Sequence, residues 1–308
     1  LGPGAGDAGG YVVYAGDMAG LLETDESATG AHFRDGAASI IEARGREPFE
    51  QGAVVIRGAA QHNLRNITVE LPRGCLTCIT GVSGSGKSSL IEDVLFANAK
   101  RMRGEPVDHV GLCDGIEGLD GFGVITMVDQ APVGTSPRAT PVTYVKVWEA
   151  IRKLYAGTSA AKSRDFKPGM FSFNSGKGRC QTCRGDGAEK VEMQFLSDVY
   201  LPCPDCEGRR FGSEVLEIIW QGRTIADMLD LTVDSARELF AERRDIAEPL
   251  RALVDVGLGY LRLGQSLNTL SGGESQRLKL ASHLALARGG KAGQPSLLLL
   301  DEPTVGLH

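Results

Sequence analysis

Three things are missing from this chain of 308 residues. No apolar run approaches the roughly 18 residues that a membrane-spanning helix needs, so we expect no transmembrane segment. The first residues show no basic region followed by an apolar stretch, so we expect no secretory signal and a cytoplasmic location. An overall positive charge is also missing. The formal net charge is −6, which argues against a generally basic nucleic-acid binder.

The seven cysteines do not have the pattern of a disulfide scaffold. Four of them form two C-x-x-C pairs, Cys180 with Cys183 and Cys203 with Cys206. Two such turns supply four thiolates at the spacing of a tetrahedral zinc site, and four thiolates leave no open position for catalysis. An iron–sulfur cluster or redox dithiols are the alternatives. Outside these pairs, Cys75 and Cys78 are expected to be buried in a strand.

A phosphate-binding loop is predicted at Gly81–Ser88, which fits the pattern G-x-x-x-x-G-K-[ST]. A strand at 76–80 before it and a helix at 87–97 after it give the context that such a loop requires. Lys87 is placed to bridge the phosphates of ATP, and the Ser88 hydroxyl to hold Mg²⁺. The predicted nucleotide contacts are Gly81, Ser83, Gly84, Ser85, Gly86, Lys87, Ser88 and Ser89.

Two acids follow an apolar strand near the other end of the sequence. Asp301 comes directly after four leucines, where a carboxylate is costly unless it faces a cation, so we expect it in the Mg²⁺ shell. Glu302 is expected to orient or deprotonate the attacking water. Gln130, at the end of an earlier strand, is a third candidate for contact with Mg²⁺ and water. The structural alternative is that the adjacent acids cap a turn.

A second anion site is predicted at Ser271, Gly272 and Gly273, which open a helix whose first N–H groups have no partner in the helix. Ser271 and Glu274 have the spacing of a capping box, and the helix should run to about residue 287. One nucleotide does not need two such sites from the same domain. The second site therefore suits a nucleotide that is held by another ATPase unit.

Strands that alternate with helices predict an α/β core. The expected strands are 54–56, 67–71, 76–80, 124–128 and 296–300, with a short β-like run at 11–14 and a further candidate strand at 214–220. The expected helices are 87–97, 143–156, 246–257, 271–287 and a short one opened by a capping box at 235–238. The cysteine region, 170–211, should be rich in loops.

Positive charge is concentrated in one segment. Between Lys146 and Lys190 there are ten basic and four acidic residues, although the whole chain carries −6. Such a basic module is a plausible footprint for an anionic polymer, and a solvated surface is the alternative. Its candidate DNA-binding residues are Lys162, Arg164, Lys167, Lys177 and Arg179.

Taken together, these motifs resemble the second ATPase half of the UvrA family, the damage-recognition subunit of the bacterial excinuclease. Leu270–Glu274 and Asp301–Thr304 are similar to motifs of ATP-binding-cassette ATPases. The resemblance to UvrA itself is carried by narrower runs over residues 54 to 308, and a similar stretch lies at Gly2–Gly10. The narrower runs are Asp129–Gly134, Phe171–Asn174, Arg184–Gly187, Val254–Tyr260 and Thr304–His308, where Val305 replaces a more usual Thr.

The resemblance implies an ABC-type P-loop ATPase core with an inserted helical, zinc-binding signature domain. It makes Gln130 the Q-loop residue, Ser271–Glu274 the signature, and Asp301 with Glu302 the Walker B pair. Neither His283 nor His308 takes the role of the switch histidine, which the family has beyond residue 308. The implied domains are 1–33, the tail of a preceding cassette; 34–52, a connector; 53–142, the ATP-binding core; 143–268, the signature domain with the zinc module; and 269–308, the signature helix and Walker B strand.

The implied function is ATP-dependent recognition of DNA damage in nucleotide excision repair. The family binds damaged double-stranded DNA as a dimer and loads UvrB; it is an ATPase and not the nuclease, and it uses ATP, Mg²⁺ and Zn²⁺. One alternative is a UvrA-like drug-resistance paralogue that acts on drug-bound DNA. Another is a zinc-stabilised DNA-binding scaffold in which ATP is a structural ligand. A transporter ATPase subunit is disfavoured by the four cysteines and the basic segment.

Overall fold

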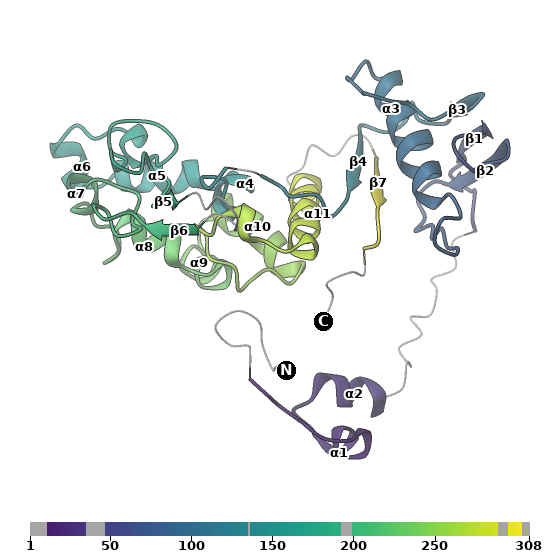
Figure 1. Ribbon diagram of the computed structural model, residues 1–308. Coiled ribbons are helices and arrows are strands. Elements are labelled where there is room, and N and C mark those ends of the chain that lie inside the picture. The colour runs from purple at the N-terminus through teal and green to yellow at the C-terminus, as the bar shows by residue number, and fades with distance from the viewer. Residues whose placement is uncertain (1–10, 35–46, 135, 192–198, 289–294, 304–308) are drawn as a thin grey trace. The chain divides into compact units, whose positions relative to one another are not determined.

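The structure, a computed structural model, describes residues 11–34, 47–134, 136–191, 199–288 and 295–303 (Figure 1). The runs at Gly2–Gly10 and Thr304–His308 lie outside the described residues. The chain divides into two compact units. The phosphate-loop unit comprises residues 32–129 and 291–305, and the signature unit comprises 1–31, 130–290 and 306–308. Each unit is described by itself.

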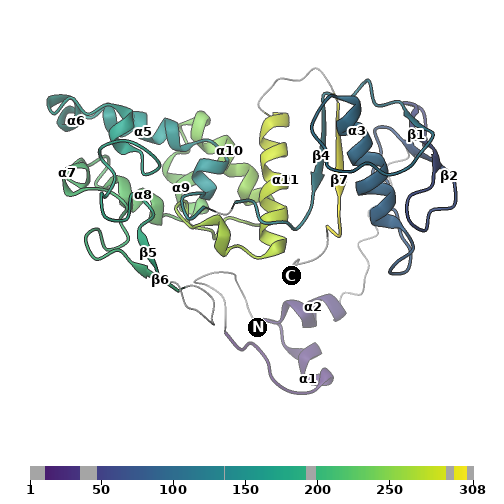
Figure 2. The ribbon, with the colours of Figure 1, turned by 45° about the horizontal axis from the view of Figure 1, so that its top comes forward.

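The phosphate-loop unit contains two small sheets and one long helical segment. Antiparallel strands form the first sheet in the order β2-β1-β3, and β4 pairs with β7 in parallel to form the second. The parallel pair is visible as two adjacent arrows in Figures 1 and 2. Its elements are β1 (Ala53–Ala59), β2 (Ile67–Pro72), the π-helix η2 (Ser89–Phe96), α3 (Ala97–Met102), β3 (Gly115–Glu117), β4 (Val124–Val128) and β7 (Ser296–Leu300).

The core of this unit follows the alternation of apolar residues along β1. Val54 and Ile56 point inward and are 2% and 0% exposed, whereas Arg57 is exposed and pairs with Glu117 on β3. Val94 and Leu95 of η2 belong to the same buried cluster. The strands expected at 54–56, 67–71, 124–128 and 296–300 and the helix after the glycine loop are therefore confirmed.

One strand prediction was wrong. Residues 76–80 belong to none of the sheets among the described residues, and Leu76 is 93% exposed. Cys75 and Cys78 are exposed rather than buried. An apolar run becomes a strand only when a neighbouring strand accepts and donates its backbone hydrogen bonds, and local sequence does not identify that neighbour. The described parallel sheet consists of β4 and β7 alone.

The signature unit is mainly helical, with its core built from aromatic side chains. Tyr155, Phe171, Phe173, Phe211 and Phe240 are at most 1% exposed. Its elements are α4 (Pro141–Tyr144), α5 (Trp148–Ala156), α6 (Ser159–Ser163), the 3-10 helix η3 (Pro168–Phe171), β5 (Ala188–Val191), β6 (Val199–Pro202), α7 (Ser213–Leu216), α8 (Ile225–Asp230), α9 (Val233–Leu239), α10 (Arg244–Asp255), the 3-10 helix η4 (Leu267–Thr269) and α11 (Gly272–Arg288). Two short helices, α1 (Met18–Glu23) and α2 (Ala28–Arg34), come before all of these elements in the sequence.

Several local predictions in this region need correction. The helix expected at 143–156 is two helices, α4 and α5, because Lys146 adopts a positive φ of 62° between them. The run 214–220 contains helix α7 and no strand, since Val215 and Ile218 are buried at helical spacing. Helix α9 begins at Val233, capped by Thr232 and not by Ser235. No named strand includes residues 11–14, and the hairpin β5–β6 was not expected.

The predicted helices at 246–257 and 271–287 correspond to α10 and α11. Among the helices in the described residues, none combines the length and the apolar character that a membrane crossing requires.

The burial of α5 predicts a large effect of one substitution. Ile151→Ala removes a side chain that is 0% exposed and should lower the free energy of unfolding by about 2–5 kcal/mol, because the core cannot close the cavity. Lys153→Ala on the same helix is the control. Its ammonium pairs with Glu149 at the surface, so it should change stability by about 0.5 kcal/mol or less. Urea unfolding of both variants checks this, and equal losses would contradict the assignment of α5 to the core.

Candidate functional site

The predicted phosphate loop lies directly before η2 and curls around a lysine. Lys87 Nζ donates hydrogen bonds to the carbonyl oxygens of Gly81 and Val82, both at 2.9 Å. Gly84 and Gly86 have φ values of 75° and 100°, a region that side chains rarely adopt. The turn thus depends on glycine at these two positions. The ammonium lies within the loop, where a phosphate group would be attracted to it.

A turn between β1 and β2 supports this loop, and sequence reasoning missed it. Asn63 Nδ2 donates to the carbonyl oxygen of Gly84 at 2.7 Å. A Cβ added at Gly86 would lie 3.0 Å from Asn63 Oδ1 and 2.9 Å from Leu64 Cδ2, so the turn and the loop are in close contact. His62 Nδ1 lies 3.0 Å from Ser89 Oγ. Nothing in a His-Asn-Leu run indicates such a contact, because it joins residues that are 21 positions apart.

Acidic groups gather at the ends of the parallel strands. The backbone N–H of Asp301 donates to Val128 O at 3.2 Å, which continues the β4–β7 pairing to the predicted Mg²⁺ ligand. Burial raises the pKa of Glu92 on η2, and the nearby carboxylates of Asp301, Asp93 and Asp129 raise it further. Asp301 is therefore close to the helix that follows the phosphate loop. Glu302 is exposed and has a positive φ of 43°.

The signature motif forms the capping box that its sequence predicts. Glu274 Oε2 accepts a hydrogen bond from the Ser271 N–H at 2.7 Å, and the Glu274 N–H donates to Ser271 Oγ at 3.3 Å. Helix α11 follows, with 17 residues. Because the first N–H groups of a helix have no carbonyl partner within it, those at Gly272 and Gly273 are the candidates for the anion contact predicted from the sequence.

Gln130 lies beside the signature motif. A Cβ added at Gly272 would lie 3.3 Å from Gln130 Oε1, and Lys279 Nζ on α11 donates to Ala131 O at 2.7 Å. The structure thus brings Gln130 together with the signature in one unit. The phosphate loop, Asp301 and Glu302 belong to the other unit.

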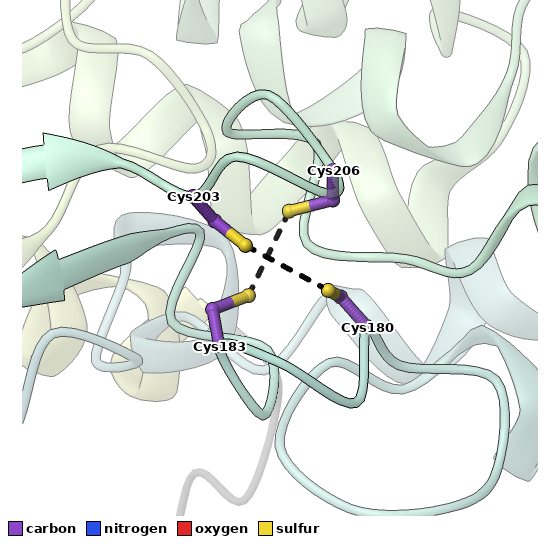
Figure 3. Close-up of side chains that lie close together, drawn as sticks. All are labelled: Cys180, Cys183, Cys203 and Cys206. Carbon is purple, nitrogen blue, oxygen red and sulfur yellow. Dashed lines mark hydrogen bonds between the residues drawn. The ribbon is translucent and has the colours of Figure 1, made fainter.

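The four cysteines of the two C-x-x-C pairs come together in the signature unit. Figure 3 shows the sulfur atoms of Cys180, Cys183, Cys203 and Cys206 pointing toward one centre. All four lie within 4.8 Å of one another; Cys180 and Cys203 are 3.9 Å apart at Sγ, and Cys183 and Cys206 are 3.6 Å apart. A zinc ion with Zn–S bonds of about 2.3 Å needs S···S edges of about 3.8 Å, so the donors fit a tetrahedral ion.

Both cysteine turns are built in the same way. The Gly187 N–H donates to Cys183 Sγ at 3.3 Å, and the Arg210 N–H, also four residues further on, donates to Cys206 Sγ at 3.4 Å. After Cys183, Arg184 and Gly185 have φ values of 52° and 90°; Glu207 and Gly208 after Cys206 have 51° and 85°. A side chain at Gly185 would overlap the carbonyl oxygen of Phe173. Glycine is therefore required where the first turn packs on the core.

Burial favours the neutral thiol form of the four cysteines, and nearby N–H groups or a cation favour the thiolate form. Burial raises the pKa of Cys206 to about 12 and also raises the pKa of Cys183. Backbone N–H groups of Cys206 and Asp205 lower the pKa of Cys203. A buried group of thiolates is costly unless a cation neutralises it, and a divalent metal ion at the centre of the four sulfurs would do so.

The candidate DNA-binding residues lie in the signature unit, and ion pairs hold two of them. Arg164 Nη1 is 2.6 Å from Glu217 Oε2, and Lys167 Nζ is 2.6 Å from Asp165 Oδ1. The Arg179 guanidinium donates to Asn174 O at 3.1 Å. Lys162 and Lys177 are exposed. The five residues thus all belong to the signature unit, and Lys162 and Arg164 flank the end of α6.

Comparison with known proteins gives a consistent set of relatives. The chain is 44% identical over 308 residues to UvrABC system protein A of Clostridium tetani, and 46% identical over 308 residues to that of Aquifex aeolicus. Each match covers 100% of this chain but 32% and 33% of the relative, so the chain spans about a third of their length. No protein-family model matches the chain.

A solved structure is similar over nearly the whole chain. The crystal structure of UvrA2 from Deinococcus radiodurans matches with a TM-score of 0.85 and 42% sequence identity, covering 99% of this chain and 36% of that one.

The four sulfurs predict a metal-binding experiment. Purified protein should contain about one zinc ion per chain by elemental analysis, and Cys203→Ser should lose it, because three thiolates hold the ion far more weakly than four. Cys75→Ser is the control, since Cys75 is exposed and outside the cluster. Iron in the wild type, or zinc retained by Cys203→Ser, would refute the zinc assignment.

Proposed function

Because the chain is homologous along its whole length to about a third of UvrABC system protein A, we propose that it is the second ATP-binding-cassette half of a damage-recognition ATPase of nucleotide excision repair. The observation that carries the proposal is that three features occur together in one chain. A phosphate loop, a capped signature helix and a buried four-cysteine cluster occur in a sequence with these relatives.

In this proposal the phosphate-loop unit binds ATP. Backbone N–H groups of Gly81–Ser89 surround the phosphates, and Lys87 turns from its carbonyl partners to the β- and γ-phosphates. Ser88 and Asp301 would hold Mg²⁺, which offsets charge on the phosphates; Gln130 remains the third Mg²⁺ contact predicted from the sequence alone. Glu302 would orient or deprotonate the water that attacks the γ-phosphate. The carboxylates of Asp301, Asp93 and Asp129 lie near Glu92, and a cation among them would offset their charge.

The signature unit serves a different nucleotide in this proposal. The N–H groups at Gly272 and Gly273 and the Ser271 hydroxyl contact the ATP of another cassette, in the same molecule or in the partner of a homodimer. The domain division proposed from the sequence remains 1–33, 34–52, 53–142, 143–268 and 269–308. We place the zinc ion in the signature domain as a structural element, since its four sulfurs are buried.

The proposed macromolecular partners are damaged double-stranded DNA and a UvrB-like protein, in the cytoplasm. Support for DNA comes from the excess of basic residues between Lys146 and Lys190 in a chain of net charge −6. One observation favours the alternative of a UvrA-like paralogue, because the similar solved structure is named UvrA2. Loading of UvrB by the purified protein would favour the repair protein over that paralogue.

Glu302 provides the test of the catalytic assignment. Glu302→Gln should lower ATP turnover by about 10²-fold or more while nucleotide binding persists, because the amide cannot accept the proton of the attacking water. Glu50→Gln, at another exposed acid of the same unit, is the control and should leave turnover unchanged. Normal turnover by Glu302→Gln, measured by phosphate release, would remove Glu302 from the mechanism.

The basic segment predicts how DNA affinity depends on salt. Replacement of Lys162, Arg164, Lys167, Lys177 and Arg179 by alanine should weaken DNA binding and flatten the plot of log affinity against log salt, by about 0.9 for each phosphate that is no longer neutralised. Arg243→Ala with Arg251→Ala removes two exposed arginines elsewhere in the same unit and should leave that slope unchanged. Unchanged affinity after the five replacements would place the DNA surface elsewhere.

A further inference from the structure

A tyrosine hydroxyl holds the acidic residue of the signature motif. Tyr260 Oη donates to Glu274 Oε1 at 2.5 Å, and the other carboxylate oxygen accepts the Ser271 N–H at 2.7 Å. Both oxygens of Glu274 are thus engaged within the protein. The Ser271 N–H is engaged as well, so the contribution of the motif to an anion would come from the Ser271 hydroxyl and the next two N–H groups.

Tyr260 is carried by a loop with a well-defined backbone. The loop follows α10, and its Leu258 N–H donates to Leu253 O at 2.9 Å. The start of α9 donates to the same loop, from Val233 N–H to Leu261 O at 2.8 Å. Leu258 and Leu261 are 0% and 1% exposed. The loop is therefore fixed on both sides of Tyr260, by backbone hydrogen bonds and by the burial of Leu258 and Leu261.

The charge states keep this bond intact at neutral pH. Burial raises the pKa of Tyr260 to about 12, and the hydrogen bond to Glu274 adds to the effect. Burial alone would raise the pKa of Glu274, but the hydrogen bonds from Tyr260 and Ser271 outweigh it, and the pKa is lowered. Arg277 favours the charged carboxylate further. The pair is therefore a neutral hydroxyl that donates to a carboxylate.

We propose that Tyr260 is a positioning residue of the ATPase, which fixes Glu274 and through it the first turn of the signature helix. This inference rests on the proposed function. Without the hydroxyl, the Glu274 carboxylate is no longer tied to the loop after α10 and can rotate toward water. The Ser271 N–H then loses its acceptor, and the N–H groups at Gly272 and Gly273 no longer have a fixed direction toward the phosphate.

Tyr260→Phe in the complete protein tests the inference, because it removes the hydroxyl and keeps the ring. We expect kcat for ATP to fall about 5- to 20-fold, whereas ATP binding by the Lys87 loop remains within about 2-fold of the wild type. In a Glu274→Ala background, Tyr260→Phe should lower kcat by less than about 2-fold further, since the tyrosine acts through Glu274.

Tyr155→Phe is the matched control. The Tyr155 hydroxyl donates to Arg223 O and Thr224 O, at 3.0 and 2.9 Å, at the start of α8, which also has a capping box. Both substitutions should lower Tm by a few degrees, because each removes a partly buried hydrogen bond. Only Tyr260→Phe should lower kcat.

The outcomes separate the two proposals. Lys87→Ala should abolish ATP binding by this chain. If binding were unchanged, the proposed function would be wrong, and the positioning role of Tyr260 would be wrong with it. If Lys87→Ala abolishes binding but Tyr260→Phe turns over ATP like the wild type or like Tyr155→Phe, only the positioning role is overturned. The same holds if the effects of Tyr260→Phe and Glu274→Ala on kcat are additive.

Discussion

The chemistry proposed for this chain depends on one constraint, namely that the first N–H groups of a helix have no carbonyl partner within it. Some helices satisfy one of these groups with a side chain at the cap, as Thr224 does for α8 and Thr232 for α9. Helix η2 after the glycine loop has no such bond, since the Ser88 side chain at its start makes no capping hydrogen bond; α5 and α10 have none either. The glycine loop before η2 also contains the Lys87 ammonium, which favours phosphate as an acceptor for N–H groups at this helix start.

The signature helix is an intermediate case. Its Ser271–Glu274 box satisfies part of the first turn, while the two glycines carry no side chain that covers the rest. A helix end that was capped throughout would offer no free N–H donor to an anion, and one without any cap would fray. The motif combines both demands by placing the cap at its first and last positions and the small residues between them.

The same reasoning explains what sequence could predict. Gly84 and Gly86 adopt positive φ values, and four cysteines of the signature unit form a buried cluster. Few residue types can occupy these positions, so the motifs can be recognised in a single sequence. Strands such as β1 and β4 are predictable because apolar side chains repeat along them. The strand prediction for 76–80 fails because its apolar residues imply a partner strand that no local pattern identifies. The break at Lys146 likewise has no signature in the apolar period of 143–156.

The side chains that support the motifs could not be predicted from the sequence, for a different reason. Asn63 and Tyr260 act over 21 and 14 positions, through side chains of types that occur on any surface. Each supports its motif through one side-chain hydrogen bond, of Asn63 to Gly84 or of Tyr260 to Glu274. The direction of that hydrogen bond is fixed only after β1, α9 and α10 have packed. A motif therefore specifies which atoms meet the ligand, whereas the fold specifies which residues hold those atoms still. For Glu274 the two roles meet in one residue, since its place in the motif is read from sequence but its bond to Tyr260 requires the fold.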